Sequence, residues 1–102
     1  MSYYAKRKPI GDFLVTAIPG KRKPDYTLVI EHKDSEEVEL TTDIFYIEDT
    51  PPGGRPPEDA NLQYTFNKVR TPFRTTIQPR AKETHIRINS PEAAGGIEIV
   101  TR

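Results

Sequence analysis

The two histidines, His32 and His85, are the side chains of this sequence best suited to acid–base catalysis near neutral pH. A catalytic histidine needs a nucleophile and an orienting group beside it. Ser2, Ser35 and Ser90 fall in turns or near the N-terminus, and none lies in a nucleophile-elbow pattern. We therefore expect no enzymatic activity. We interpret both histidines as exposed, and we expect their joint replacement by glutamine to leave fold and function intact.

An acidic cluster of four residues could attract a cation: Asp34, Glu36, Glu37 and Glu39. Its order, D-S-E-E-V-E, lacks the ligand spacing and the glycine of a calcium-binding loop. The chain has no cysteine, so thiolate metal sites and disulfides are excluded. No glycine-rich phosphate loop follows a predicted strand. The sequence therefore predicts neither a metal site nor a cofactor.

Two basic clusters and two tyrosines are candidates for binding a partner. They comprise Tyr3, Tyr4, Lys6, Arg7, Lys8, Lys21, Arg22 and Lys23. Aromatic residues interleaved with cations are typical of proteins that stack the bases of single-stranded nucleic acid. The same cations also suit an acidic protein surface. The residue types alone leave both partners open.

The net charge of zero comes from three blocks of opposite sign. Residues 1–24 carry a net charge of +5, residues 25–61 carry −9, and residues 62–102 carry +4. Proteins that bind nucleic acid usually show one dominant basic footprint instead. A surface with separate basic and acidic zones can bind a copy of itself or a neighbour in a larger assembly.

The segments that contain the histidines and flank the basic cluster of residues 21–23 are predicted to be β-strands. Apolar and polar residues alternate in short segments that are bounded by turn residues. The expected strands cover residues 12–18, 25–32, 37–41, 43–48, 62–69, 73–78, 83–89 and 97–101. Ten prolines argue against a helical fold. The sequence predicts an all-β protein, a small two-sheet β-sandwich (Ig-like or jelly-roll-like) of about seven short strands.

Three segments lie outside this pattern, and the smallest is an expected loop over residues 89–96 that ends in two glycines. Residues 1–9 have no apolar face and are expected to form an extended basic arm, while residues 10–102 form a single β domain. Deleting the arm is expected to leave thermal unfolding almost unchanged. Residues 49–61 form a long Pro/Gly-rich loop that contains Arg55, and loops of this length are usually functional or disordered.

The expected core consists of inward members of alternating strands: Leu28, Ile30, Tyr64, Phe66, Ile86 and Ile88. The run from Ile44 to Ile47 is instead apolar on both faces. One of those faces would contact a neighbouring subunit, through Phe45, unless the strand curls around a barrel edge.

The function we expect is structural. The chain would bind protein subunits, its own copies or charge-complementary neighbours, and its contacts would include Phe45 and Arg55 as well as the basic clusters. A phage or virus particle is the expected setting, with the chain as a capsid decoration, connector or tail protein. This is an analogy of architecture alone. The alternative is a single-stranded nucleic-acid-binding barrel of the OB type.

The sequence shows no signal peptide and no apolar run of about 18 residues, so no membrane partner is expected. The absence of cysteine fits a reducing compartment. A virion or the cytoplasm would suit these features.

Overall fold

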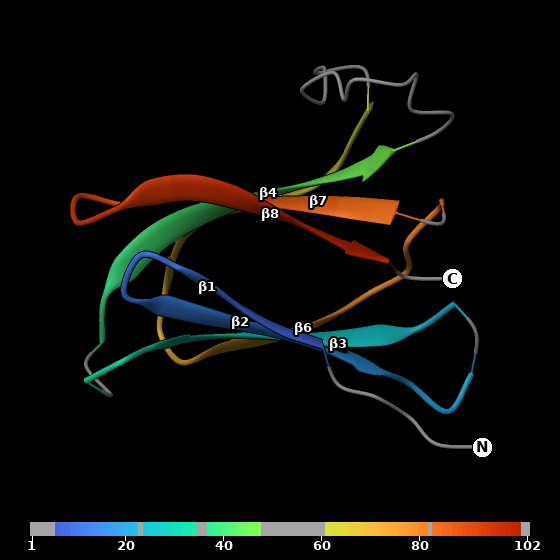
Figure 1. The fold of residues 1–102 in the computed structure, drawn as a ribbon, viewed down its shortest axis with the longest axis horizontal. Helices are drawn as coiled ribbons and strands as arrows, with labels where there is room; N and C mark the ends of the chain where they lie inside the picture. Colours follow the sequence, from blue (N-terminus) through green and yellow to red (C-terminus); the bar gives the residue numbers. More distant parts are fainter. Residues whose placement is uncertain (1–5, 23, 35–36, 48–60, 82, 101–102) are drawn as a thin grey trace.

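The computed structural model describes residues 6–22, 24–34, 37–47, 61–81 and 83–100. These residues form eight β-strands and no α-helix (Figure 1). The strands are β1 (Lys6–Ile10), β2 (Phe13–Pro19), β3 (Tyr26–His32), β4 (Glu39–Ile47), β5 (Leu62–Arg70), β6 (Phe73–Ile77), β7 (Glu83–Asn89) and β8 (Ala94–Val100).

The strands make two four-stranded antiparallel sheets that face each other as two layers (Figure 1). The N-terminal sheet has the order β1-β2-β3-β6, and the C-terminal sheet has the order β5-β4-β7-β8. The predicted all-β, two-sheet sandwich is confirmed. Residues 37–41 and 43–48, expected as two strands, contribute to the single strand β4, because Thr41 and Thr42 continue the pairing with β7.

The core lies between the sheets and follows the expected alternation. Leu28, Ile30, Ile86 and Ile88 are at most 1% exposed. The other two predicted core residues, Tyr64 and Phe66, are only partly buried and pack against the core from β5. Strand β5 is at the edge of its sheet, so fewer neighbours surround these rings.

Strand β1 corrects the expectation of an arm over residues 1–9. Residues 6–9 belong to the β domain, because Lys6 pairs with Ala17 and Pro9 pairs with Leu14 across the β1–β2 ladder. The segment lacks an apolar face since it is an edge strand, where charged residues and proline deter pairing with other chains. Residues 1–5 and nearly all of the expected 49–61 loop lie outside the described residues.

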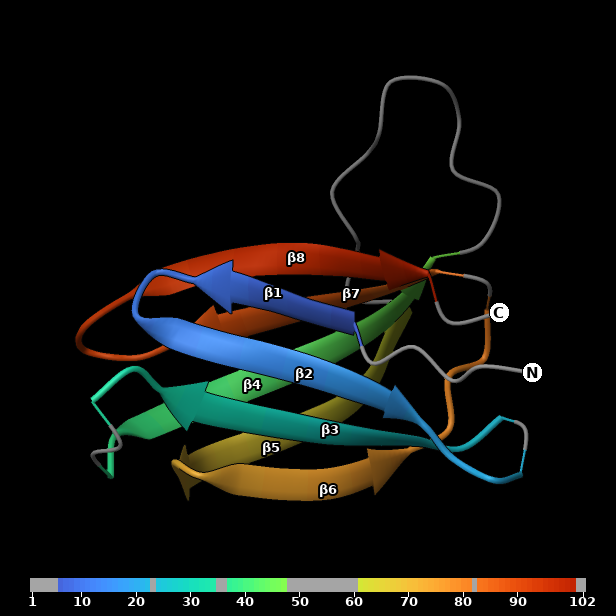
Figure 2. The same ribbon diagram turned by 60° about the horizontal axis from the view of Figure 1, so that its bottom comes forward.

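Edge strands of the two sheets approach each other at the sides of the sandwich. On one side β1 lies beside β8 (Figure 2), and on the other the Phe66 ring of β5 packs against the Phe73 ring of β6, with 5.3 Å between the ring centroids. Lys8 Nζ donates a hydrogen bond to the Glu98 carbonyl across the first side, at 2.8 Å. Across the second side the Gln78 backbone N–H donates to the Tyr64 hydroxyl at 3.0 Å. These bonds join the two layers at their margins.

Candidate interaction surfaces

His32 is buried at the end of β3, which contradicts its interpretation as an exposed residue. Its side chain is 4% exposed, and its Nε2 lies 3.0 Å from Glu92 Oε2. The backbone N–H of Asp34 points at Nδ1 from 3.4 Å, so Nε2 carries the proton and donates to Glu92. The imidazole also meets the Phe13 ring edge-on. Both ring nitrogens therefore face groups of the chain itself.

His85 lies on the outer face of the C-terminal sheet, where its side chain is 17% exposed. The distance from its Nδ1 to Glu98 Oε1 is 3.8 Å, which is too long for a hydrogen bond. His85 Nδ1 therefore has no hydrogen-bond partner among the described residues. Burial lowers the pKa of His85, and the Arg87 charge acts in the same direction while Glu98 opposes both. The neutral imidazole is therefore the favoured form near neutral pH.

Phe45 is not a free contact residue, which corrects the expectation that it meets a neighbouring subunit. Its side chain does point outward, opposite His85 on β7, but it is only 1% exposed. The Arg87 guanidinium lies 4.8 Å from the centre of the Phe45 ring, and the His85 ring packs beside it. Long arginine side chains cover apolar surface in this way. The outward phenylalanine is thus covered by its own sheet.

Polar side chains pair with each other at three places on the outer face of the C-terminal sheet. Arg87 Nη2 donates to Asp43 Oδ2 at 2.9 Å, and the Thr65 hydroxyl donates to Asp43 Oδ1 at 3.0 Å. The Thr41 hydroxyl donates to Asn67 Oδ1 at 2.9 Å. A partner at this face would have to compete with these bonds.

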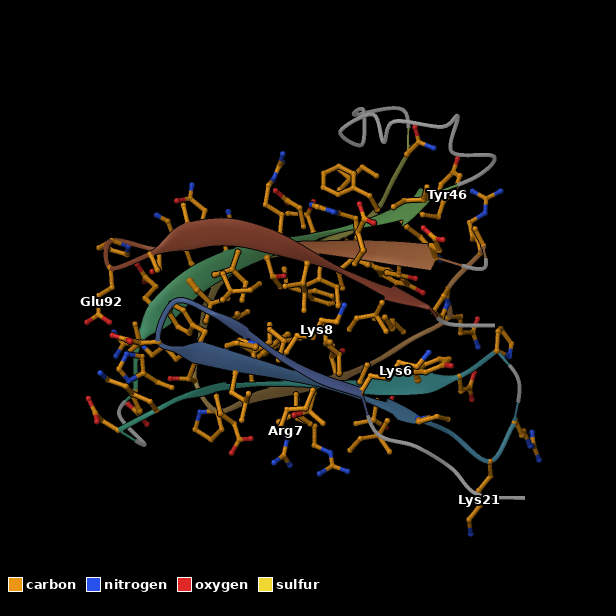
Figure 3. All side chains as sticks on the ribbon, viewed as in Figure 1. Lys6, Arg7, Lys8, Lys21, Tyr46 and Glu92 are labelled. Carbon is orange, nitrogen blue, oxygen red and sulfur yellow. The ribbon has the colours of Figure 1, made fainter. Side chains whose placement is uncertain are left out.

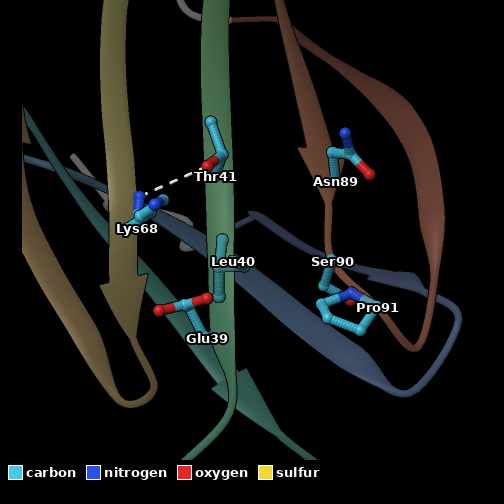
Figure 4. A pocket seen from close by; sticks show the side chains of 7 residues that line it. All are labelled: Glu39, Leu40, Thr41, Lys68, Asn89, Ser90 and Pro91. Atoms are coloured by element: carbon cyan, nitrogen blue, oxygen red, sulfur yellow. Dashed lines mark hydrogen bonds between the residues drawn. The ribbon is translucent and has the colours of Figure 1, made fainter.

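A shallow groove of about 310 Å³ crosses β4 near its start (Figure 4). Its lining comprises Glu39, Leu40, Thr41, Lys68, Asn89, Ser90 and Pro91. The Lys68 backbone N–H donates to the Thr41 hydroxyl at 3.2 Å, and the Ser90 hydroxyl accepts the N–H groups of Glu92 and Ala93. Ser90 therefore stabilises the β7–β8 turn. The groove contains neither histidine, so no serine–histidine pair is assembled there.

The structure separates the predicted basic residues into three environments. Lys6 and Lys8 point between the layers, Arg7 points away from them, and Lys21 lies on the β2–β3 turn (Figure 3). Arg22 shares that turn and is exposed, as expected for a loop tip. The remaining predicted contact residues, Tyr3, Tyr4, Lys23 and Arg55, lie outside the described residues.

The outer face of the N-terminal sheet, which we name the docking face, differs from the outer face of its partner sheet. Its centre consists of Leu14, Thr16, Ile18, Thr27 and Val29, which alternate with buried inward residues of β2 and β3. None of these five is charged, and the acidic residue of β3 on this face is Glu31, which is exposed and pairs with Leu14. Leu14, Ile18 and Val29 keep part of their surface exposed, whereas Thr16 is 4% exposed and its hydroxyl lacks a hydrogen-bond partner among the described residues.

Two arginines flank this apolar centre on one row across the sheet. Arg7 pairs with Thr16, Thr16 with Val29, and Val29 with Arg74. Three strand spacings place the two arginine backbones about 14 Å apart. Neither guanidinium has an ion pair or hydrogen bond among the described residues. Sequence reasoning had selected Arg7 but not Arg74, whose row position only the strand pairing reveals.

Comparisons with protein-family models, with curated proteins and with solved structures found no match. In the described part of the chain no helix is long and apolar enough to cross a membrane. Within the same residues, no group of three or more histidines and acidic residues is placed to hold a metal ion.

Proposed function

We propose that this protein is a non-catalytic subunit of a larger assembly and that its docking face binds a further copy of the chain. The observation that carries this proposal is the row Arg7–Thr16–Val29–Arg74, with an apolar centre and two unpaired arginines. Apolar surface supplies affinity when it is buried, and unpaired arginines at its margin supply orientation. On the opposite outer face, Arg87 is instead paired with Asp43 at 2.9 Å.

The second copy supplies charges that complement the two arginines. Asp34 and Glu39 are exposed at the end of the sandwich away from the basic β2–β3 turn. A contact between this acidic end and the docking face of another copy would join two different surfaces. Such heterologous contacts produce rings or open filaments, which suits a repetitive assembly. By analogy of architecture, we propose a phage or virus particle as the setting, with the chain as a decoration, connector or tail subunit.

The docking face is too small to form a permanent dimer alone. A sheet of four strands with about six residues each presents roughly 400 Å². Stable complexes bury about 800 Å² on each partner. Association through this face should therefore be weak and reversible, and a stable assembly would need a second contact.

Binding of single-stranded nucleic acid is the weaker alternative. Two separate four-stranded sheets replace the closed five-stranded barrel on which that hypothesis depended. The docking face also carries no aromatic side chain that could stack on a base.

Light scattering over a concentration series, with and without a single-stranded oligonucleotide, tests the proposal. We expect the mean molar mass to rise with protein concentration and to fall when the salt concentration is raised. The mass should be the same with and without the oligonucleotide. A protein that stays monomeric at every concentration yet binds the oligonucleotide would contradict self-assembly and support the alternative.

A further inference from the structure

The seam between β1 and β8 contains a cationic cleft that adjoins the docking face at Arg7. Its volume is about 340 Å³, and its lining residues are Lys6, Arg7, Lys8, Glu98 and Ile99. Each of these two strands is at the edge of its own sheet, and the two edges lie side by side (Figure 2). The cleft is therefore bordered by two strands that each have one open side.

Strand register explains why two lysines point into this cleft. Lys6 pairs with Ala17 and Lys8 pairs with Val15, and both partners are buried on the inner face of the sheet. Lys6 and Lys8 consequently extend between the layers, as Figure 3 shows, while Arg7 points the other way. Lysines directed inward from an edge strand place positive charge where a further strand would have to pair.

The two ammonium groups differ in their partners. Lys8 Nζ donates to the Glu98 carbonyl at 2.8 Å. Lys6 has no hydrogen bond or ion pair with any described residue. Burial lowers the pKa of Lys6, and the nearby Lys8 charge adds to this effect. An anion bound beside Lys6 would relieve both penalties.

No carboxylate of the described residues neutralises the seam. Glu98 is the acidic residue of its lining, but Glu98 Oε1 lies 3.8 Å from His85 Nδ1 on the outer face of the C-terminal sheet. Glu98 thus presents its backbone carbonyl to Lys8 and its carboxylate elsewhere. The cleft keeps a net positive charge.

We propose that this seam binds an extended acidic segment of a protein partner, with a carboxylate held between the ammonium groups of Lys6 and Lys8. Open strand edges offer backbone donors and acceptors to an extended segment, and the inward lysines select against uncharged strands and in favour of acidic ones. The proposal shares with the proposed function the expectation of a protein partner, and the seam meets the docking face at Arg7. The carboxylate contact uses Lys6 and Lys8, which the docking face does not include, and could supply the second contact that a stable assembly needs.

NMR titration of the full-length ¹⁵N-labelled protein tests the seam directly. The probes are a blocked tetraglutamate peptide, the matching tetraglutamine peptide and inorganic phosphate. We expect tetraglutamate to shift the amide signals of Lys6, Lys8, Glu98 and Ile99 saturably, and tetraglutamine to leave them unchanged. Lys6→Met should weaken tetraglutamate binding about fivefold, the upper range for one partly exposed ion pair. Lys21→Met removes an equal charge on the β2–β3 turn and should leave the affinity unchanged.

Three results would overturn the proposal. One is the absence of saturable shifts at the seam, and another is equal weakening by Lys6→Met and Lys21→Met, which would indicate general charge attraction. The third is phosphate binding as tight as tetraglutamate, because the seam would then be a simple oxyanion site. The docking-face variant Val29→Glu should still bind tetraglutamate, so failure of the seam and failure of the proposed function are distinguishable.

Discussion

His32 Nε2 and Glu92 Oε2 lie 3.0 Å apart, and their contact joins the last residue of β3 to the β7–β8 turn of the other sheet. Glu92 reaches this position because the Ser90 hydroxyl accepts the Glu92 N–H at 3.1 Å and fixes the turn. The pair therefore links the two layers at one end of the sandwich, while Lys8 and Glu98 link them along one side.

Replacing His32 with glutamine should destabilise the fold. The shorter amide cannot satisfy Glu92 and Asp34 together, and the loss of hydrogen bonds at a buried site costs about 1–2 kcal/mol. Urea unfolding measures this cost. Glu92→Gln is the matched control and should cost less, because the Glu92 side chain is 49% exposed and an amide still accepts a hydrogen bond. A His32→Gln variant as stable as the parent would show that the link contributes nothing.

His85 should make stability depend on pH. Its pKa in the folded protein lies below the usual value of about 6.5, so the unfolded chain takes up a proton first as the pH falls. The stability contributed by neutral His85 is thus present above about pH 6.5 and decreases below it. In His85→Gln, the loss of unfolding free energy between about pH 7.5 and pH 5.5 should be smaller than in the parent. Identical losses in the two proteins would contradict the shift.

Gly96 provides the space that the His85 ring occupies. A Cβ at Gly96 would lie 2.5 Å from His85 Nε2 and 3.4 Å from the Ile86 carbonyl oxygen. Gly96→Ala should therefore displace the imidazole from Phe45 and cost about 1–3 kcal/mol. The same substitution in a His85→Ala background should cost clearly less, and thermal unfolding of the four proteins completes the cycle. Equal costs in both backgrounds would mean that the imidazole is not the obstacle.

Removal of residues 1–9 should lower the unfolding temperature, contrary to the expectation for a free arm. The deletion eliminates most of the β1–β2 ladder and exposes part of the core at the β2 edge of the sheet. A variant with glutamine at positions 6, 7 and 8 retains the strand backbone and separates pairing from charge. It should unfold close to the parent temperature. Near-identical unfolding of the deletion and the parent would refute the role of β1.

Alternation in the sequence was sufficient to predict the sandwich and much of its core. Leu28, Ile30, Ile86 and Ile88 occupy the predicted inward positions because a strand alternates its faces with a period of two. Local patterns could not predict β1, since an edge strand bearing lysines and a proline shows no apolar face. The signal that could have identified it is its position directly before the Gly11 turn, where φ is +56°.

The environments of the candidate site residues depend more on contacts between residues far apart in the sequence than on the local sequence pattern. Phe45 looked exposed because the sequence does not show that Arg87 covers it from the neighbouring strand. His32 looked solvent-facing because its partner, Glu92, is 60 residues away. Arg7 and Arg74 form one row only through three successive strand pairings. Such relationships arise from topology, which short-range alternation does not specify.

Sedimentation equilibrium of docking-face variants tests the central claim most directly. Val29→Glu places a carboxylate in the apolar centre between Arg7 and Arg74, whereas the control Leu62→Glu places the same charge at the exposed start of β5, away from Glu39. We predict that the parent and Leu62→Glu associate reversibly with equal strength, and that Val29→Glu is monomeric but unfolds at a temperature close to that of the parent. Undiminished association of a folded Val29→Glu variant would contradict the docking face.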